Sequence, residues 1–354
     1  MTGHMTGHMT GHMRIHAMKK PTVLCTLALD PAGLELLEGI ADVVVAPNPG
    51  AQTLYRMIGD ADILLVRNLL PPDLFERPHR LRGVVRNGTG LDFIPVASAT
   101  AQGIPVANVP GANAQAVAEY CIGSFLSLSR RFSAMDNALR SKGWDAARAL
   151  TTMTGELAGK TVGIVGLGTI GTALAKACVF GFGMRVLAYR PRAEGMPDFV
   201  ESADLETLFA HSDFVSLNCP LNAQTRHLVN ADRLRSMKRT AVIVNASRGP
   251  VVDEDALVTA LREGWIKAAA LDVYNEQPIR RNHPFLELDN VVLTPHAAAL
   301  TCESSARMSA GAARQIVQLL NGQRPDHLVN PEVWGGYRER TLLLDATHTS
   351  GGSQ

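Results

Sequence analysis

Three apolar, strand-like segments in the second half of the chain end in side chains that can do acid–base or anion-binding chemistry. The first leads to Arg248, the second contains Asp272 and the third leads to His296. Ligands of doubly wound sheets bind beyond the carboxyl ends of the strands, so these side chains are expected to act together. An imidazolium can donate a proton to a forming alkoxide, and a guanidinium can hold a carboxylate and polarise a carbonyl. The set therefore suits hydride transfer to a carbonyl.

The sequence G-L-G-T-I-G, which begins at Gly166, fits the pattern G-x-G-x-x-G. It follows the apolar run Thr-Val-Gly-Ile-Val and precedes a helix-like segment, which is the context in which this motif binds dinucleotides. Gly166 would make the tight turn, Gly168 would let the backbone approach a pyrophosphate, and Gly171 would let helix and strand pack closely. Thr169 and Ile170 begin the helix, whose N-terminus attracts phosphates. A dinucleotide site is predicted, and an ordinary glycine-rich turn is the less favoured alternative.

The end of the next strand-like segment bears on the choice of cofactor. NAD-binding proteins of this kind carry an acidic residue there, but this chain has Arg190. An arginine cannot accept a hydrogen bond from a ribose hydroxyl, but it pairs with a 2′-phosphate. With Arg192 beside it, NADP is favoured over NAD. The alternative is that both arginines are solvated loop charges and that NAD is used.

Two series of alternating strand-like and helix-like segments position these residues. Such alternation predicts parallel sheets with helices on their faces. Strands of the first series are expected at 22–29, 42–46, 62–67, 83–86 and 105–107. Strands of the second series are expected at 161–166, 185–190, 214–219, 241–246, 268–273 and 291–294.

The segments between and after the two series define the expected domains. A long helix over 113–141 is interpreted as a connector, and a last helix over 302–320 could return to the first domain. The predicted fold is α/β, with two doubly wound parallel-sheet domains, one inserted into the other. A Rossmann NAD(P)-binding domain, 113–298, interrupts a flavodoxin-like substrate domain formed by 19–112 and 299–334. The ends are expected to be a disordered, tag-like segment over 1–18, with Met-Thr-Gly-His three times over, and a loose tail over 335–354.

Composition narrows the class of partner. The chain has 34 Lys+Arg and 33 Asp+Glu, a net charge of +1, which argues against a nucleic-acid or membrane-surface role driven by bulk charge. No apolar run approaches the roughly 18 residues of a membrane span. Five scattered cysteines without a C-x-x-C pair indicate buried thiols in a reducing cytoplasm. No metal site is expected, since Thr and Gly in the N-terminal repeat disfavour a helix with chelating histidines.

Motifs along the whole of 19–334 resemble those of the D-isomer-specific 2-hydroxyacid dehydrogenases. The matching segments are Gly88-Thr89-Gly90-Leu91-Asp92, Asn108-Val-Pro-Gly111 with Val117-Ala118-Glu119, the glycine motif at 166–171, Cys219-Pro220-Leu221 with Thr225-Arg226, Asn245-Ala-Ser-Arg248-Gly249 with Val252-Asp253, Leu271-Asp272-Val273 and Thr294-Pro295-His296. Together they are far more specific than any one of them alone.

The resemblance implies a role for each matching position. Arg248 would bind the substrate carboxylate and carbonyl, and His296 would be the acid/base. Substrate contacts are implied at Arg67, Asn68 and the backbone amides of Thr89 and Gly90, in a cleft between the domains. Cofactor contacts are implied at Cys219, Pro220, Thr225, Asn245, Ala246 and Asp272, with His296 close to the nicotinamide.

One position departs from the family pattern. The family usually has a Glu five residues after the aspartate of Leu-Asp-Val, and that Glu pairs with the catalytic His; here the count reaches Gln277, and Glu276 is one step off. A neutral amide can orient the ring of His296 without raising its pKa as a carboxylate would. Reductive activity should therefore fall at a lower pH than in relatives that carry the Glu. Similar formate dehydrogenases also have Gln before Pro here, and Asn113 matches a polar position that they use.

The leading hypothesis is an NAD(P)-dependent dehydrogenase that interconverts a small, unphosphorylated 2-oxo acid, such as glyoxylate or hydroxypyruvate, and its D-2-hydroxy acid. Phosphoglycerate and formate dehydrogenases remain alternatives, as does a non-catalytic dinucleotide-sensing corepressor. The presence of both Arg248 and His296 favours an enzyme. The resemblance also favours a homodimer, and the helix over 113–141, with apolar Ile122, Phe125, Leu126 and Leu128, would pack in the core or form its two-fold interface.

Overall fold

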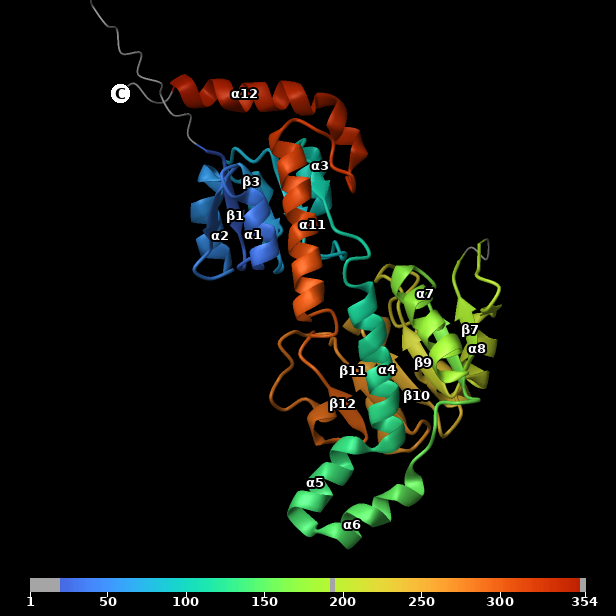
Figure 1. Ribbon diagram of the computed structural model, residues 1–354. Coiled ribbons are helices and arrows are strands. Elements are labelled where there is room, and N and C mark those ends of the chain that lie inside the picture. Colours follow the sequence, from blue (N-terminus) through green and yellow to red (C-terminus); the bar gives the residue numbers. More distant parts are fainter. Residues whose placement is uncertain (1–19, 192–194, 351–354) are drawn as a thin grey trace, which may run out of the picture.

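The computed structural model describes residues 20–191 and 195–350, which form two lobes, each built on a parallel sheet covered by helices (Figure 1). Every strand pair in both sheets is parallel, which confirms the predicted α/β class. The predicted disordered segment 1–18 lies outside the described residues. All eleven predicted strands are present, most of them shorter than expected, and the short β8 was not predicted.

The smaller lobe contains a five-stranded sheet of order β2-β1-β3-β4-β5, which is the flavodoxin-like order. Its central strands are apolar and buried, as parallel strands between two helical layers must be. The elements of this lobe are β1 (Thr22–Cys25), α1 (Pro31–Leu37), β2 (Asp42–Val45), α2 (Ala51–Met57), β3 (Ile63–Val66), β4 (Gly83–Arg86), α3 (Val96–Ala101), β5 (Val106–Ala107) and α11 (Cys302–Leu320).

The larger lobe contains a seven-stranded sheet of order β12-β11-β10-β9-β6-β7-β8. The strand order reverses at β6, between β7 and β9, which is the switch point at which Rossmann sheets bind dinucleotides. The elements are α4 (Ala114–Arg130), β6 (Thr161–Val165), α7 (Thr169–Lys176), β7 (Arg185–Tyr189), β8 (Glu201–Ser202), α8 (Leu205–His211), β9 (Phe214–Leu217), α9 (Ala231–Ser236), β10 (Val242–Asn245), α10 (Glu254–Arg262), β11 (Ala268–Leu271) and β12 (Val291–Leu293).

Helix α11 returns from the larger lobe to the smaller one (Figure 1). Its buried face, with Ala312, Ile316 and Leu319, shares a core with β1, β3 and β4. Helices α1 and α11 approach so closely that a Cβ on Gly33 would lie 2.8 Å from the carbonyl oxygen of Ser309, so only glycine fits there. The smaller lobe is therefore built from segments on both sides of the larger lobe in the sequence, which is the arrangement expected for an inserted domain.

The expected continuous helix over 113–141 is interrupted. Helix α4 ends at Arg130. The next residue, Arg131, has a left-handed φ of 57°, and the chain continues as α5 (Phe132–Lys142) and α6 (Trp144–Ala149). The apolar face of α4 packs in the core of the larger lobe, where Phe125 is fully buried and Ile122, Leu126 and Leu128 are half-buried. Helix α5 has no buried residue, and the α5–α6 arm projects from the lobe (Figure 1).

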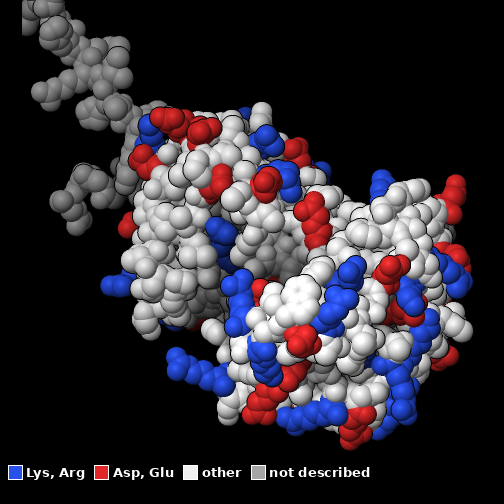
Figure 2. Space-filling view, turned by 60° about the horizontal axis from the view of Figure 1, so that its bottom comes forward, with Lys and Arg blue, Asp and Glu red and all other residues white. Residues whose placement is uncertain are grey.

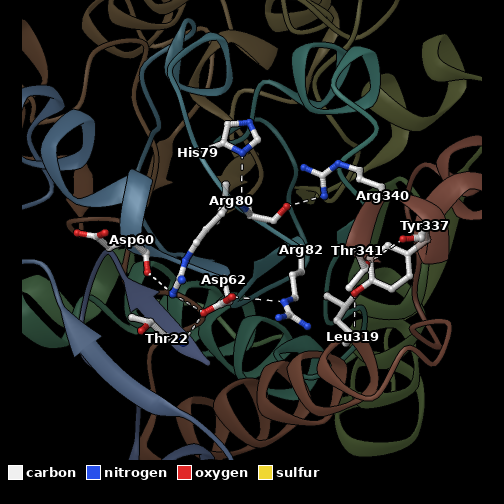
Figure 3. Close-up of polar contacts among 11 residues, drawn as sticks. Thr22, Asp60, Asp62, His79, Arg80, Arg82, Leu319, Tyr337, Arg340 and Thr341 are labelled. Carbon is white, nitrogen blue, oxygen red and sulfur yellow. Dashed lines mark hydrogen bonds and ion pairs between the residues drawn. The ribbon is translucent and has the colours of Figure 1, made fainter. Parts of the chain in front are cut away.

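The predicted loose tail is wrong for the described residues up to 350, because they form helix α12 (Tyr337–Ser350) at the end of the smaller lobe (Figure 1). Tyr337 is 2% exposed, its ring stacks on Trp334 at 4.4 Å, and its hydroxyl donates to the carbonyl oxygen of Leu319 at 2.7 Å. Arg340 donates to the carbonyl oxygen of Leu81 at 2.6 Å (Figure 3). These contacts fix the start of α12 despite the Gly-Gly that precedes it.

A polar cluster ties together the amino-terminal edge of the smaller sheet, close to α12 (Figure 3). The carboxylate of Asp62 accepts hydrogen bonds from the Thr22 backbone at 2.7 Å, from Arg80 at 2.9 Å and from Arg82 at 3.3 Å. In parallel sheets this edge is opposite to the ligand-binding edge, so we assign the cluster a structural role.

Candidate active site

The residues predicted to react lie where the strand ends of the two lobes meet. Arg248 follows β10 and His296 follows β12, and these two residues contact Asp92 and Phe93, respectively, in the loop after β4. Figure 2 shows a hollow between the lobes, with charged side chains at its margin. The fold therefore brings residues of both sheets to one cleft.

The amide of Gln277 holds the ring of His296. Nδ1 of His296 lies 2.8 Å from Oε1 of Gln277, and Nε2 of Gln277 donates to the carbonyl oxygen of Tyr274 at 3.3 Å. A carbonyl oxygen only accepts hydrogen bonds, so Oε1 must face the ring and accept the proton of Nδ1. The ring proton of neutral His296 therefore lies on Nδ1, and Nε2 is the ring nitrogen that Gln277 does not occupy. Burial is the main cause that lowers the pKa of His296 below its ordinary value.

Glu276, the neighbour of Gln277, does not replace the missing carboxylate. Its Oε2 lies 2.5 Å from Nη2 of Arg280, and both side chains are exposed. The hydrogen-bond partner of His296 is therefore neutral, as predicted from the departure at this position.

Asp272, which is 1% exposed, holds the loop that carries His296 in place. His296 has a φ of 55°, which is uncommon for a residue other than glycine, and its backbone N–H donates to the carbonyl oxygen of Asp272 at 2.8 Å. The carboxylate of Asp272 accepts from Thr294 Oγ1 at 2.6 Å and from the N–H groups of Ala297 at 2.7 Å and Ala298 at 2.9 Å. These bonds fix the backbone that aims the imidazole.

Asn245 plays a similar part for Arg248. Its side chain donates to the carbonyl oxygen of Arg248 at 2.9 Å and accepts from Ser247 N and Oγ at 3.0 and 2.8 Å. Arg248 in turn pairs with Asp92 of the smaller lobe through two hydrogen bonds, Nε to Oδ2 at 3.0 Å and Nη2 to Oδ1 at 2.6 Å. Ala246 is the half-buried residue between the strand end and this turn.

The Thr89–Gly90 loop lies directly against Arg248. A Cβ on Gly90 would be 1.9 Å from Nη2 of Arg248, so glycine is required for this contact. The carbonyl oxygen of Thr89 accepts from Asn108 at 2.8 Å, and its hydroxyl donates to Val109 O at 3.2 Å. The loop is thus held rigidly beside the guanidinium, where its amides were predicted to bind a carboxylate.

Arg67 and Asn68, which follow β3, are anchored within the smaller lobe. Arg67 Nη1 donates to the carbonyl oxygen of Ala28 at 2.9 Å, and Thr26 Oγ1 donates to Asn68 Oδ1 at 3.4 Å. Within the described parts of the chain the structure gives Arg67 no hydrogen bond to Arg248 or His296. Both residues remain half-buried.

The glycine turn joins β6 to α7 as predicted. Gly166 has a φ of 98°, and a Cβ there would lie 2.7 Å from the carbonyl oxygen of Asn218. A Cβ on Gly171 would lie 2.3 Å from the carbonyl oxygen of Gly166, so the third glycine allows helix and strand to pack. Gly168 and Thr169 are exposed at the start of the helix, and Ile170 is half-buried against the core.

Arg190 follows β7 beside this turn, because the N–H of Gly166 donates to the carbonyl oxygen of Tyr189 at 2.8 Å. Arg192 lies outside the described residues. In the loop after β9, Thr225 Oγ1 donates to the carbonyl oxygen of Pro220 at 2.6 Å.

Cys219, which precedes Pro220, is 8% exposed, and burial raises the pKa of its thiol to about 11. At neutral pH this side chain is therefore a protonated, neutral thiol at the edge of the loop, and not a nucleophile.

Comparison with known proteins fits this geometry. Residues 122–298 match the model of the D-isomer specific 2-hydroxyacid dehydrogenase NAD-binding domain. A glyoxylate reductase from Thermofilum pendens is 41% identical over 327 residues, which are 89% of this chain and 96% of the relative. The chain belongs to the D-isomer-specific 2-hydroxyacid dehydrogenase family. The predicted resemblance, and with it the enzyme class, is confirmed.

Two further proteins that are similar to this chain carry different names. A D-3-phosphoglycerate dehydrogenase from Methanocaldococcus jannaschii is 38% identical over 87% of this chain and 59% of the relative. The solved structure of an NADPH-dependent glyoxylate/hydroxypyruvate reductase from Sinorhizobium meliloti, in complex with NADP and malonate, superimposes with a TM-score of 0.79. The two chains are 30% identical, and the match covers 88% of this chain and 97% of the reductase chain.

Sequence reasoning about this D-2-hydroxyacid dehydrogenase missed Asp92 and Arg86 as site residues. Arg86, at the end of β4, donates to the carbonyl oxygen of Gly90 at 3.1 Å and lies over the ring of Phe93 at 4.7 Å. Burial lowers the pKa of Arg86 to about 10. The available signal was a charged residue at the end of an apolar strand, the same signal that identified Arg248.

Residues 20–191 and 195–350 contain no group of three or more His, Cys, Asp or Glu side chains arranged to hold a metal ion. In the same part of the chain, no helix has both the length and the apolar character needed to cross a membrane.

Proposed function

We propose that the protein uses NAD(P)H to reduce a small, unphosphorylated 2-oxo acid of the glyoxylate or hydroxypyruvate type to its D-2-hydroxy acid. The observation that carries this proposal is the convergence of His296, Arg248 and the Thr89–Gly90 loop on one cleft. The substrate class is supported by the glyoxylate reductases that match this chain over most of its length.

In the proposed reaction a nicotinamide held beside the glycine turn would supply a hydride to the carbonyl carbon. Arg248 and the amides of Thr89 and Gly90 hold the substrate carboxylate, and Arg248 also polarises the carbonyl. Nε2 of protonated His296 gives its proton to the carbonyl oxygen, so the addition of one hydride and one proton yields the hydroxyl group. Approach of the two lobes would exclude water from the cleft.

The glycine turn supports a dinucleotide. Gly166 and Gly171 are required by contacts within the protein, whereas Gly168 is not: a Cβ there meets no atom within 4 Å. The φ of Gly168 is −89°, which any residue can adopt. Close approach of a pyrophosphate to the backbone would explain a glycine at this position.

We also propose a preference for NADPH over NADH, supported by Arg190 at the end of β7 beside the glycine turn. The guanidinium would pair with the 2′-phosphate. A comparison of kcat/KM for the two cofactors tests this, and Arg190→Ala should reduce the preference for NADPH. A clear preference of the wild type for NADH would contradict it.

The test of the activity is a panel of 2-oxo acids with NADPH and NADH, with formate and phosphoglycerate assayed alongside in the presence of the oxidised cofactors. Reduction of glyoxylate or hydroxypyruvate, lost in His296→Ala, is expected. Faster turnover of phosphoglycerate or formate would favour the dehydrogenases of those substrates. Full activity of His296→Ala would refute the assigned chemistry and leave the dinucleotide-sensing alternative.

We propose that the protein is a homodimer and that the α5–α6 arm forms its interface. Phe132 is 52% exposed, Leu139 48% and Trp144 66%, which is unusual exposure for large apolar side chains on one projecting arm. Sedimentation equilibrium should give twice the mass of one chain. The double variant Phe132→Asp with Trp144→Asp should give one chain mass.

We propose a reducing, cytoplasmic location. Four of the five cysteines are buried free thiols, and the fifth, Cys302, is exposed. Exposed free thiols persist where disulfides do not form. Fractionation of the source cells tests the location.

A further inference from the structure

The carboxylate of Asp92, in the smaller lobe, forms an ion pair with Arg248 of the larger lobe. Asp92 and Arg248 are 156 positions apart in the chain, and their side chains are joined by two parallel hydrogen bonds, 3.0 and 2.6 Å long. The exposed fraction is 40% for the Asp92 side chain and 25% for that of Arg248. An ion pair with this exposure contributes little to folding stability. A role in stability therefore gives a poor explanation of the pair.

The pair determines which side of the guanidinium remains for a ligand. A guanidinium has five N–H groups. Asp92 takes the Nε N–H and one of Nη2, and the carbonyl oxygen of Ser247 takes one of Nη1 at 2.7 Å. Counting bonds to the described residues, one N–H on Nη1 and one on Nη2 remain. Because Asp92 occupies the side shared by Nε and Nη2, the remaining Nη2 proton points away from Asp92.

The same pair holds the guanidinium against the loop predicted to bind the substrate carboxylate. Asp92 is two residues beyond Gly90, and Nη2 of Arg248 lies against Gly90 so closely that no Cβ fits. Burial would raise the pKa of Asp92, but the hydrogen bonds and charge of Arg248 lower it below its ordinary value overall. The carboxylate is thus ionised at neutral pH.

We propose that Asp92 is a positioning residue for the reduction: it turns Arg248 so that one edge of the guanidinium faces the substrate, and it does so only when the two lobes are together. This inference rests on the proposed function, because it assigns to Asp92 the orientation of a residue that binds substrate there. Asp92 itself lies on the far side of the guanidinium from the substrate. It would couple approach of the lobes to assembly of the site.

The test is Asp92→Asn, assayed with glyoxylate and NADPH. An amide cannot accept two charge-assisted bonds, so kcat should fall about tenfold or more, because a loss of about 1.4 kcal/mol in the transition state is tenfold. The Kd for NADPH, measured by fluorescence, should stay within about twofold. Asp92→Glu keeps the carboxylate and should recover part of kcat. The matched control is Asp73→Asn, which removes a surface carboxylate paired with Arg77 at 2.8 Å, and should leave kcat unchanged.

Two further readouts separate positioning from a structural role. Asp92 is one of the charges that favour protonated His296, so Asp92→Asn should move the fall of kcat/KM to lower pH. Lysine has no planar guanidinium to orient. In an Arg248→Lys background, Asp92→Asn should therefore lower kcat much less than it does in the wild type. Equal losses in both backgrounds would show that Asp92 does not act through Arg248.

The outcomes distinguish this inference from the proposed function. Asp92→Asn with wild-type kcat and an unchanged pH profile, while His296→Ala is inactive, overturns the inference alone. A wild type that reduces no 2-oxo acid overturns the proposed function. If Asp92→Asn does not fold, Asp92→Ser, which also lacks the carboxylate, decides: a kcat below wild type with unchanged melting temperature supports positioning, and an unchanged kcat refutes it.

Discussion

Gln277→Glu is the substitution that tests the acid–base chemistry most directly. In the wild type, Oε1 of Gln277 lies 2.8 Å from Nδ1 of His296 and carries no charge, and burial lowers the pKa of His296. Reduction needs the imidazolium as proton donor, so kcat/KM for the 2-oxo acid should decline as pH rises through this lowered pKa. A carboxylate in place of the amide stabilises the imidazolium and moves the decline to higher pH.

The size of the shift follows from the distance. Two unit charges about 4 Å apart interact by about 4 kcal/mol at an effective dielectric constant of about 20. Gln277 is exposed, so we expect half of this value or less to remain. Since one pKa unit corresponds to about 1.4 kcal/mol, the shift should be about one unit. In the oxidative direction, where neutral His296 is the base, the rise in activity should move upward by the same amount.

The assay is kcat/KM for glyoxylate with NADPH from about pH 5 to about pH 9, with both proteins in the same buffers. Glu276→Gln is the matched control, because Glu276 pairs with Arg280 and should leave the profile unchanged. Superimposable profiles of the wild type and Gln277→Glu would refute the view that this neighbour sets the protonation of His296. A shift to lower pH would give the wrong sign and refute it equally.

Three further variants test separate parts of the structure. Gly168→Ala should weaken NADPH binding about tenfold (about 1.4 kcal/mol) in a titration and leave the melting temperature unchanged, because its Cβ meets open space in the protein; unchanged affinity would contradict this. Asp272→Asn should lower kcat and cost about 1–3 kcal/mol of stability in urea unfolding, because an NH₂ group would face the N–H of Ala297 or Ala298; a fully active variant would contradict the loop-holding role. Tyr337→Ala should cost about 3–5 kcal/mol of stability and leave kcat unchanged, since α12 lies away from the cleft; no loss of stability would show that α12 does not contribute to the core.

The sheets could be predicted because their strands are apolar on both faces. Runs such as Val-Ile-Val in β10 and Ala-Ala-Ala-Leu in β11 stand out from any surrounding pattern, and the residues after them are polar because they face the cleft. Errors were confined to strand ends and to β8, whose Glu201 and Ser202 are exposed and carry no apolar signal.

Two errors arose where the local sequence gives no signal of the structure. The chain turns at Arg131 in a left-handed conformation, yet arginine is no typical residue for this conformation and the helical pattern continues on both sides. Helix α12 follows Gly-Gly and is polar, but Tyr337 inserts its ring between Trp334 and the core, so its start is fixed by packing. Neither the left-handed turn at Arg131 nor the packing of Tyr337 can be predicted from the local sequence.

The candidate active site shows the same difference between what local sequence predicts and what tertiary contacts decide. The placement of His296, Arg248 and the glycine turn at one edge could be predicted because each follows a strand of one sheet, and parallel strands must bring their carboxyl ends to one edge. Asp92 could not be assigned a role, because its partner Arg248 belongs to the other sheet, and neither motif contains information about the distance between the lobes. Topology within a sheet predicts which candidate residues lie at the same edge, whereas contact between the sheets decides how their side chains are oriented. Residues like Asp92, which bridge the cleft, therefore need the structure for their assignment.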